Sequence, residues 1–389
     1  MGPRPDPELR RRLAGAALYG AGMIAGATSL AYFFVLVPLA SRDPAARYAS
    51  MGVGALYALP PLAIYLWIPR LFDRFDPEPW WALALVLGWG AIAACGISAA
   101  VNTEVERLAA GVGGREYAEM MGACVSAPLV EEALKGAAVL GVFYFLRREF
   151  DGAVDGVIYA TFAALGFAAV ENVIYYGRAA AGPGDTLATT FVVRGVLAPW
   201  IHPLYTSMTG LGVGIARETT RRWLRWAAPA AGYVVAVALH FVWNAAGAKS
   251  GFLTVLMLPM WLFFVLAFGL LLASLVARKG RIIRAYLRDE VVLGNLTPDE
   301  MRLVGSAFGG LTATFAWGGE PGRRFVRAGA RLALCKWHAG RARRGRTDTV
   351  STDWIVPLRH ELFALRSEVA RALGRPVPQP RAWVGPRGG

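Results

Sequence analysis

Ionisable and amide side chains stand inside four consecutive apolar stretches of the sequence. In chain order they are Glu131, Glu132 and Lys135, then Glu171 and Asn172, then His202, then His240 and Asn244. Burying such groups in an apolar segment is costly, so each of them calls for an explanation. Their types suit hydrolysis, because a desolvated carboxylate can take a proton from water and later return it. Imidazoles can bind a metal ion or donate to a developing oxyanion, and an amide can help to hold that charge.

The spacing of these residues indicates which of them share a helix face. Side chains four residues apart are neighbours on an α-helix. This spacing pairs Glu131 with Lys135, Phe167 with Glu171, and His240 with Asn244. Glu132 points about 100° away from Glu131, so the two carboxylates need not do the same job. Two histidines with one or two glutamates also form an acceptable zinc set. Its candidate ligands are Glu131, Glu171, His202 and His240, although the chain has no HExxH motif.

Each of these residues also has a purely structural explanation. A glutamate with Lys135 could form a buried ion pair, and for Lys135 itself pairing or snorkelling is the favoured role. Glu171 and Asn172 could link helices by hydrogen bonds, and packing accounts for Phe167. A lone intramembrane histidine is often a satisfied core residue. The joint placement of two histidines with two acidic sites favours one shared functional site.

The elements that must position these residues are long apolar helices. The chain of 389 residues is 56% hydrophobic and 17% charged, whereas globular proteins have about 45–50% apolar and about 25% charged residues. A stretch of about 20 apolar residues crosses a hydrocarbon core of about 30 Å. Such stretches lie at 14–39, 50–69, 81–102, 122–146, 153–176, 195–216, 226–247 and 252–277. We therefore predict an all-α, polytopic membrane protein with about eight transmembrane helices.

The distribution of cations predicts how these spans are oriented. Basic residues gather at alternate ends of the spans, at 10–12, 70–74, 147–148 and 217–225. By the positive-inside rule both termini are cytoplasmic, and the protein is a multi-pass protein of the cell membrane. Glu131, His202 and His240 then lie about a third of the way in from the outer face, counted at about 1.5 Å per residue. Glu171 lies within about a turn or two of that level. Costly groups at nearly one depth on sequential helices are expected to meet.

The composition changes after residue 277. Residues 278–389 hold 21 Lys and Arg against 9 Asp and Glu, which is +12 of the chain's net charge of +14. We predict a transmembrane domain at 1–277 and a basic, helical cytoplasmic region at 278–389 with a disordered end. Thr297 followed by Pro298 and two acidic residues predicts a helix start, and further helices are expected near 322–343 and 352–373. Anionic lipid is favoured over nucleic acid as the partner of this region, because the region follows the last span and no nucleic-acid-binding motif is present.

Several separated runs resemble one protein family. They are Asp73-Arg74-Phe75-Asp76-Pro77-Glu78-Pro79-Trp80, Ala-Pro-Leu-Val-Glu-Glu-Ala-Leu-Lys at 127–135, Glu149-Phe150-Asp151-Gly152, Asp155-Gly156-Val157-Ile158-Tyr159, Gly-Phe-Ala-Ala-Val-Glu-Asn at 166–172, then His202, and His240 to Asn244. In this order they resemble the PrsW-type intramembrane proteases, over about residues 65–250. The related CAAX prenyl-protease-like membrane proteins share the double glutamate and the later His followed by Asn. They carry His where this chain has Glu171.

The resemblance implies an activity and roles for the cluster. The activity is cleavage of membrane-anchored regulatory proteins, such as anti-sigma factors, near the membrane surface. Glu131 is implied to activate water, with Glu171, His202 and His240 around it. Glu132 and Asn244 complete the candidate catalytic set, and Lys135, Phe167 and Asn172 support it. The family is described as metallo- or glutamic-type, so zinc stays a candidate cofactor.

Two other classes of protein would use the same residues differently. A proton- or cation-coupled transporter could relay ions through the intramembrane acids and histidines. No internal repeat of the kind common in transporters is evident, which weighs against this alternative. A non-catalytic membrane scaffold or immunity protein could keep the helices without any reaction. Peptide cleavage, ion flux or neither would discriminate among the three.

Overall fold

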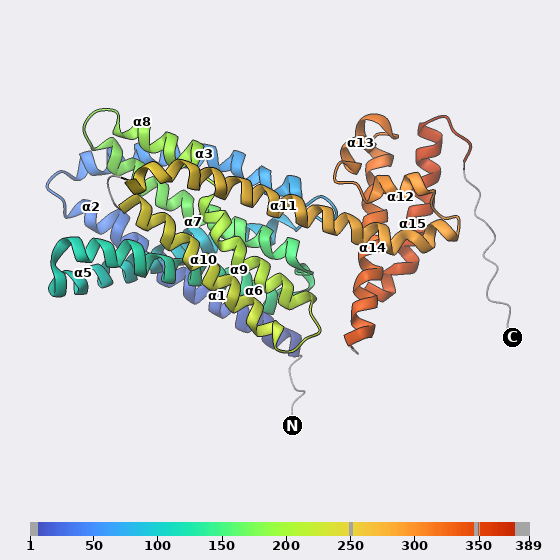
Figure 1. Cartoon of the computed structure of the whole chain (residues 1–389), viewed down its shortest axis with the longest axis horizontal. Coiled ribbons are helices and arrows are strands. Elements are labelled where there is room, and N and C mark those ends of the chain that lie inside the picture. Colours follow the sequence, from blue (N-terminus) through green and yellow to red (C-terminus); the bar gives the residue numbers. More distant parts are fainter. Residues whose placement is uncertain (1–6, 249–251, 346–348, 350, 378–389) are drawn as a thin grey trace, which may run out of the picture. The chain divides into compact units, whose positions relative to one another are not determined.

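The computed structural model describes residues 7–248, 252–345, 349 and 351–377 (Figure 1). These residues form helices and no strand, which confirms the predicted all-α class. They fall into two compact units, one within Met1–Leu71 and Glu78–Leu270, the other within Phe72–Pro77 and Leu271–Gly389. The helix that crosses residue 277 continues to Val292, so the predicted domain boundary at that position stays a prediction. The end predicted to be disordered falls largely outside the described residues.

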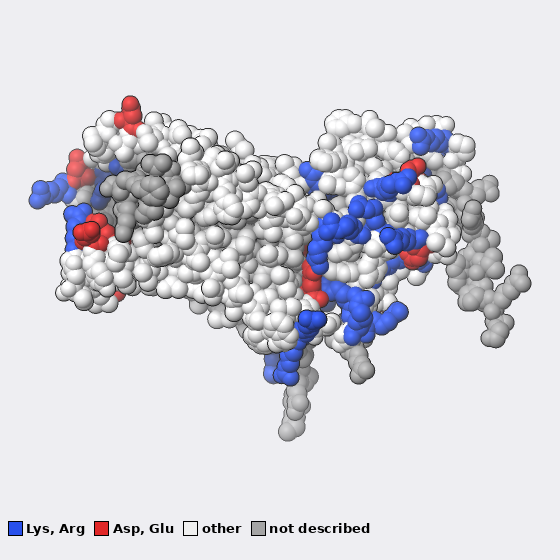
Figure 2. Space-filling model, viewed as in Figure 1, with Lys and Arg blue, Asp and Glu red and all other residues white. Residues whose placement is uncertain are grey.

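The first unit consists of long helices joined by short connections. In chain order they are α1 (Pro7–Ala31), α2 (Val37–Leu39), α3 (Pro44–Phe72), α4 (Trp80–Gly88), α5 (Cys95–Met120), α6 (Ala127–Phe145), α7 (Ala153–Ala180), α8 (Thr186–Phe191), α9 (Ile201–Glu218), α10 (Leu224–Ala248) and the first part of α11 (Phe252–Val292). The π-helical turns are η1 (Tyr32–Leu36), η2 (Trp89–Ala94), η3 (Met121–Ser126) and η5 (Val192–Leu197), and η4 (Arg147–Glu149) is a 3-10 turn. On the face shown in Figure 2, the charged side chains of this unit gather at its ends and leave its middle uncharged. That distribution is typical of a protein that crosses a bilayer.

Six helices among the described residues are long and apolar enough to cross a membrane. They are Glu8–Leu39, Pro44–Phe72, Trp80–Phe145, Ala153–Ala180, Leu224–Gly247 and Met257–Val292. The sequence predicted about eight spans, and the difference has two reasons. The run Trp80–Phe145 contains two of the predicted spans. The other reason is α9, which has 18 residues and carries His202 together with Arg217 and Glu218 near its end, so its composition is too polar.

The run Trp80–Phe145 reverses its direction at Gly114. The backbone there has φ 77° and ψ −170°, a conformation that only glycine adopts at low cost. Asn102, before the turn, accepts a hydrogen bond from Ser126 Oγ after it, at 2.7 Å. The two halves of the run therefore lie side by side, as the predicted spans 81–102 and 122–146 require.

Helix α7 is the central element of the first unit. Almost all of it is buried, and it packs against α4, η2, α6 and α9. Glycines allow α7 and α9 to approach closely. A Cβ atom on Gly156 would lie 2.1 Å from the carbonyl oxygen of Gly210, and one on Gly210 would lie 2.1 Å from that of Gly156. Close contact through small residues is the usual way in which membrane helices pack. It fixes the two helices that carry Glu171 and His202.

The second unit has an apolar core of its own. It contains the end of α11, then α12 (Pro298–Val304), α13 (Gly309–Ala316), α14 (Glu320–Gly345) and α15 (Ser351–Ala372). The helices predicted near 322–343 and 352–373 are thereby confirmed. So is the helix start at Thr297, whose hydroxyl accepts from the Glu300 N–H at 3.1 Å while the Glu300 carboxylate accepts from the Thr297 N–H at 2.6 Å. Ile283, Phe325 and Leu362 are among the buried residues of this core.

Candidate active site

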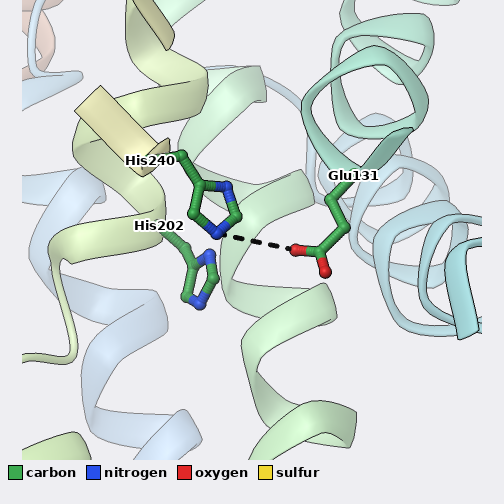
Figure 3. Close-up of side chains that lie close together, drawn as sticks. All are labelled: Glu131, His202 and His240. Atoms are coloured by element: carbon green, nitrogen blue, oxygen red, sulfur yellow. Dashed lines mark ion pairs between the residues drawn. The ribbon is translucent and has the colours of Figure 1, made fainter. Parts of the chain in front are cut away.

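Side chains from four helices and one π-helical turn meet inside the first unit. They come from α6, α7, η5, α9 and α10, and most of them are buried. Glu131 and Glu132 are adjacent on α6. His202 on α9 and His240 on α10 reach toward Glu131 (Figure 3). The prediction that the intramembrane acids and histidines lie close together agrees with this arrangement.

Glu132 is the best satisfied member of the cluster. Its Oε1 accepts from Lys135 Nζ at 2.6 Å and lies 3.1 Å from His240 Nδ1, and its Oε2 accepts from Thr206 Oγ1 at 2.8 Å. A carboxylate can only accept, so His240 carries its proton on Nδ1. The Nε2 atom of His240 is then left with a free lone pair. Glu132 therefore sets the orientation and the tautomer of His240.

Glu171 sets the orientation and the tautomer of His202 in the same way. Its Oε2 lies 3.1 Å from His202 Nε2 and also forms an ion pair with Arg194. Arg194 in turn donates from Nε to Asn172 Oδ1 at 2.7 Å. The other nitrogen of His202, Nδ1, lies 3.4 Å from the Lys135 ammonium group, which can only donate. His202 therefore carries its proton on Nε2 and presents a lone pair on Nδ1.

Glu131 has unused acceptor capacity. Its Oε2 is buried without a hydrogen-bond partner, with Lys135 Nζ at 3.6 Å and His240 Nε2 at 4.0 Å. Its Oε1 is 3.4 Å from Asn102 Nδ2, which is a long contact. Figure 3 shows Glu131 facing His240, with one ring nitrogen of His202 turned toward the same place. Three groups with lone pairs thus converge on one point.

This convergence suits a metal ion. One ligand atom each from Glu131, His202 and His240 lie within 4.8 Å of one another. Histidines that bind metals usually donate their other N–H to a carboxylate, as His240 does to Glu132 and His202 does to Glu171. The residues present therefore fit an ion. Glu171, which was predicted as a fourth ligand, is instead engaged by Arg194 and His202.

The supporting residues lie in different places. The Lys135 ammonium nitrogen lies 4.3 Å from the ring centroid of Phe167. The ring centroids of Phe167 and His202 are 5.7 Å apart. Asn172 contacts the cluster only through Arg194. Asn244, expected to help hold an oxyanion, donates to the carbonyl oxygen of Ala123 at 2.8 Å. Its amide nitrogen is thus engaged by the backbone of η3 rather than by a member of the cluster.

Sequence reasoning missed three participants. Arg194 is not among the residues singled out from the sequence, although a charge inside an apolar stretch calls for the same explanation there. It lies in η5, and π-helical turns are frequent at functional sites. Tyr205 stacks on His240 with ring centroids 5.0 Å apart, and Asn102 approaches Glu131. No sequence signal distinguishes these two from other polar residues in apolar helices.

The fold and the cluster together define a class of protein. It is a polytopic, helical membrane protein with a buried centre of carboxylates and histidines. A family model described as the PrsW family intramembrane metalloprotease matches residues 78–270, which include every member of the cluster. This match, over about half of the chain, supports a PrsW-type intramembrane protease, as the sequence motifs predicted.

A curated relative supports the same assignment. Protease PrsW of Geobacillus kaustophilus (strain HTA426) is 28% identical over 172 residues, which cover 44% of this chain and 68% of the relative. No solved structure matches the chain. The family description specifies a metal-dependent peptidase, and the Glu131, His202 and His240 group is where the described residues could hold an ion.

Proposed function

We propose that this protein is an intramembrane endopeptidase in which the Glu131 carboxylate activates water. The observation that carries the proposal is the buried Oε2 of Glu131, which has no hydrogen-bond partner and faces two imidazole rings. A buried acceptor without a partner costs stability, so it is retained where a reacting molecule supplies the missing partner. A water molecule that donates to Glu131 would restore the hydrogen bond and lose its proton in the same contact.

The other side chains orient the histidines and balance the charge around that water. Glu132 and Glu171 hold the tautomers in which His240 and His202 turn lone pairs inward. Lys135 supplies positive charge beside Glu131 and Glu132, and Arg194 neutralises Glu171. After attack on the peptide carbonyl, the proton held by Glu131 passes to the departing amine. Glu131 is then ready to accept a proton from the next water.

We further propose that the resident ion is zinc, held by His202, His240 and one oxygen of the Glu131 carboxylate, whose other oxygen accepts the proton from water. When bound, such an ion polarises the scissile carbonyl and lowers the pKa of water. Support comes from the donor set, because one carboxylate and two imidazoles with carboxylate partners suit zinc. A glutamic-type reaction without metal uses the same Glu131, and it is the alternative within this proposal.

The substrates are proposed to be membrane-anchored regulatory proteins, such as anti-sigma factors. The family resemblance supports this class. With both termini in the cytoplasm, as the cations predict, the cluster lies nearer the outer face of the cell membrane. Cleavage would then occur within the outer half of a substrate's membrane anchor.

The proposal is tested with the purified, full-length protein in lipid vesicles. A fluorescent peptide with one membrane-spanning segment should be cleaved, cleavage should stop when zinc is chelated, and a single zinc ion should be found per chain. Cleavage that resists the chelator would exclude the metal and leave the glutamic-type reaction. Proton or cation flux without cleavage of any membrane-anchored peptide would overturn the protease and support a transporter.

A further inference from the structure

Helix α13 of the second unit exposes its largest apolar side chains. Phe308, which precedes the helix, and Leu311 and Phe315 within it are 61%, 57% and 81% exposed. They follow one another at intervals of three and four residues, so they share one face. The opposite face, which carries Ala313, is buried in the core of the unit. The helix therefore packs through a small residue and leaves three large apolar ones outside.

The chain that leads into α13 is fixed to α11 next to the end of the last predicted span. Gly305 packs against Gly280 on α11, where an added Cβ would lie 2.6 Å from the Gly305 carbonyl oxygen. Gly280 is three residues beyond residue 277, where the last predicted span ends. Arg284, one turn later, donates to the same Gly305 oxygen at 2.5 Å. The segment before α13 thus returns to α11 just beyond the predicted end of the last span.

A second contact independently holds the start of α13 at the same level. Arg74 donates to the Ala307 carbonyl oxygen at 2.5 Å, and its guanidinium group lies 5.2 Å from the Phe308 ring centroid. Arg74 belongs to the short connection between α3 and α4, both of which begin or end a candidate span. Such a connection lies at the surface of the bilayer. Phe308 therefore lies close to that surface.

The charge of the unit identifies the partner. Residues 278–389 carry a net charge of +12, and Figure 2 shows Lys and Arg side chains spread over this unit. Apolar and aromatic side chains flanked by cations are typical of segments that lie in the interface of an anionic membrane. Two contacts within this unit tie the start of α13 to segments that adjoin candidate membrane spans in the chain, which favours lipid over a protein partner.

We propose that Phe308, Leu311 and Phe315 form an interfacial anchor that inserts into the cytoplasmic leaflet. The basic side chains of the same unit contact anionic headgroups around it. Insertion of these apolar side chains adds to the attraction between charges, and it requires no peptide cleavage by the protein.

The anchor is tested by fluorescence of the full-length protein in vesicles of phosphatidylcholine and phosphatidylglycerol. The partly buried Cys335 is first changed to Ser, since Cys95 and Cys124 are buried. A polarity-sensitive probe is then attached in Leu311→Cys, or in Asp353→Cys as the control on an exposed, acidic position of α15. The probe at residue 311 should be blue-shifted and quenched by nitroxide-labelled lipid, and the probe at residue 353 should show neither effect. Equal behaviour of the two probes would overturn the proposal.

A second variant separates the anchor from a protein-binding surface. With the probe in Leu311→Cys, Phe308→Ser together with Phe315→Ser should remove most of the quenching. Both side chains are exposed, so the unit should keep its helix content, which circular dichroism measures. Undiminished quenching in this variant would contradict insertion. Shielding of the probe in native membranes but not in purified vesicles would assign the face to a protein partner instead.

Discussion

Two buried glutamates, one in each unit, differ in how fully their carboxylate oxygens are hydrogen-bonded. Glu290 in the second unit is completely buried, and both of its oxygens are engaged. Arg359 Nη2 donates to it at 2.7 Å and Asn295 Nδ2 at 2.6 Å, and Lys336 forms a further ion pair. The hydrogen bond that Arg359 donates to Glu290 also raises the pKa of Arg359, so this pair stays charged at any physiological pH. Glu290 has no capacity left for another partner.

Glu131 in the first unit is buried almost as deeply, yet one of its oxygens has no hydrogen-bond partner. Cations are near both carboxylates, so proximity to a cation does not distinguish them. The distinction lies in what is left unsatisfied. A structural carboxylate is surrounded until its acceptors are filled, whereas a reactive one keeps an acceptor for a molecule that comes and goes. This contrast predicts which substitutions stop the reaction and which only weaken the fold.

The largest effects are expected from the two histidines. His202→Ala or His240→Ala removes an inward lone pair, and each should reduce cleavage by about 10²-fold or more. Because both rings serve one centre, the double variant should be little worse than either single variant. Initial rates of peptide cleavage in vesicles measure this. Losses that multiply in the double variant would mean that the rings act separately.

An intermediate effect is expected from Arg194, which touches the centre only through Glu171. Arg194→Met removes the charge that keeps Glu171 oriented toward His202 Nε2, and zinc affinity should fall about 10- to 100-fold, as for other partners of metal ligands. Arg194→Lys should restore part of it, because Lys keeps the charge without the fork of donors. Zinc titration with a fluorescent chelator gives the affinities. Unchanged affinity in Arg194→Met would show that Glu171 needs no such support.

The smallest effect on the reaction is expected from Glu290. Glu290→Gln breaks a buried pair, and the second unit should lose roughly 2–3 kcal/mol, since loss of one partner of a fully buried pair costs about 3–5 kcal/mol and Arg359 is partly exposed. Hydrogen exchange of the amides in α14 and α15 should therefore become faster. Cleavage by the intact protein should stay at the wild-type rate. If Glu290→Gln abolished cleavage and left the hydrogen exchange of these amides unchanged, Glu290 would be the reactive carboxylate rather than a structural one.

The sequence predicted the helices and the cluster for physical reasons that act locally. Apolar length identified the membrane helices, and the cost of a buried charge identified Glu131, Glu171, His202 and His240. The start of α12 followed from Thr297, because a cap needs only residues that are neighbours in the chain. These features require no knowledge of which helices touch.

The partners within the cluster could not be predicted, because they depend on contacts between helices. Spacing showed that Glu131 and Glu132 point apart, but only the packing of α9 and α10 assigns His240 Nδ1 to Glu132. The π-helical turn η5 interrupts the regular helical spacing and turns Arg194 toward Glu171. Asn244 shares a face with His240, yet the backbone of η3 takes its amide N–H.

The central claim is tested most directly by comparing Glu131→Gln with Glu290→Gln for cleavage of the same membrane-anchored peptide. Both substitutions remove one buried carboxylate and keep its size, so insertion and helix content should be similar to those of the wild type. The account predicts that Glu131→Gln lowers cleavage by about 10²-fold or more, because an amide cannot take the proton from water. Glu290→Gln should cleave at the wild-type rate. Near-normal cleavage by Glu131→Gln would contradict the account, whatever the metal content of the protein.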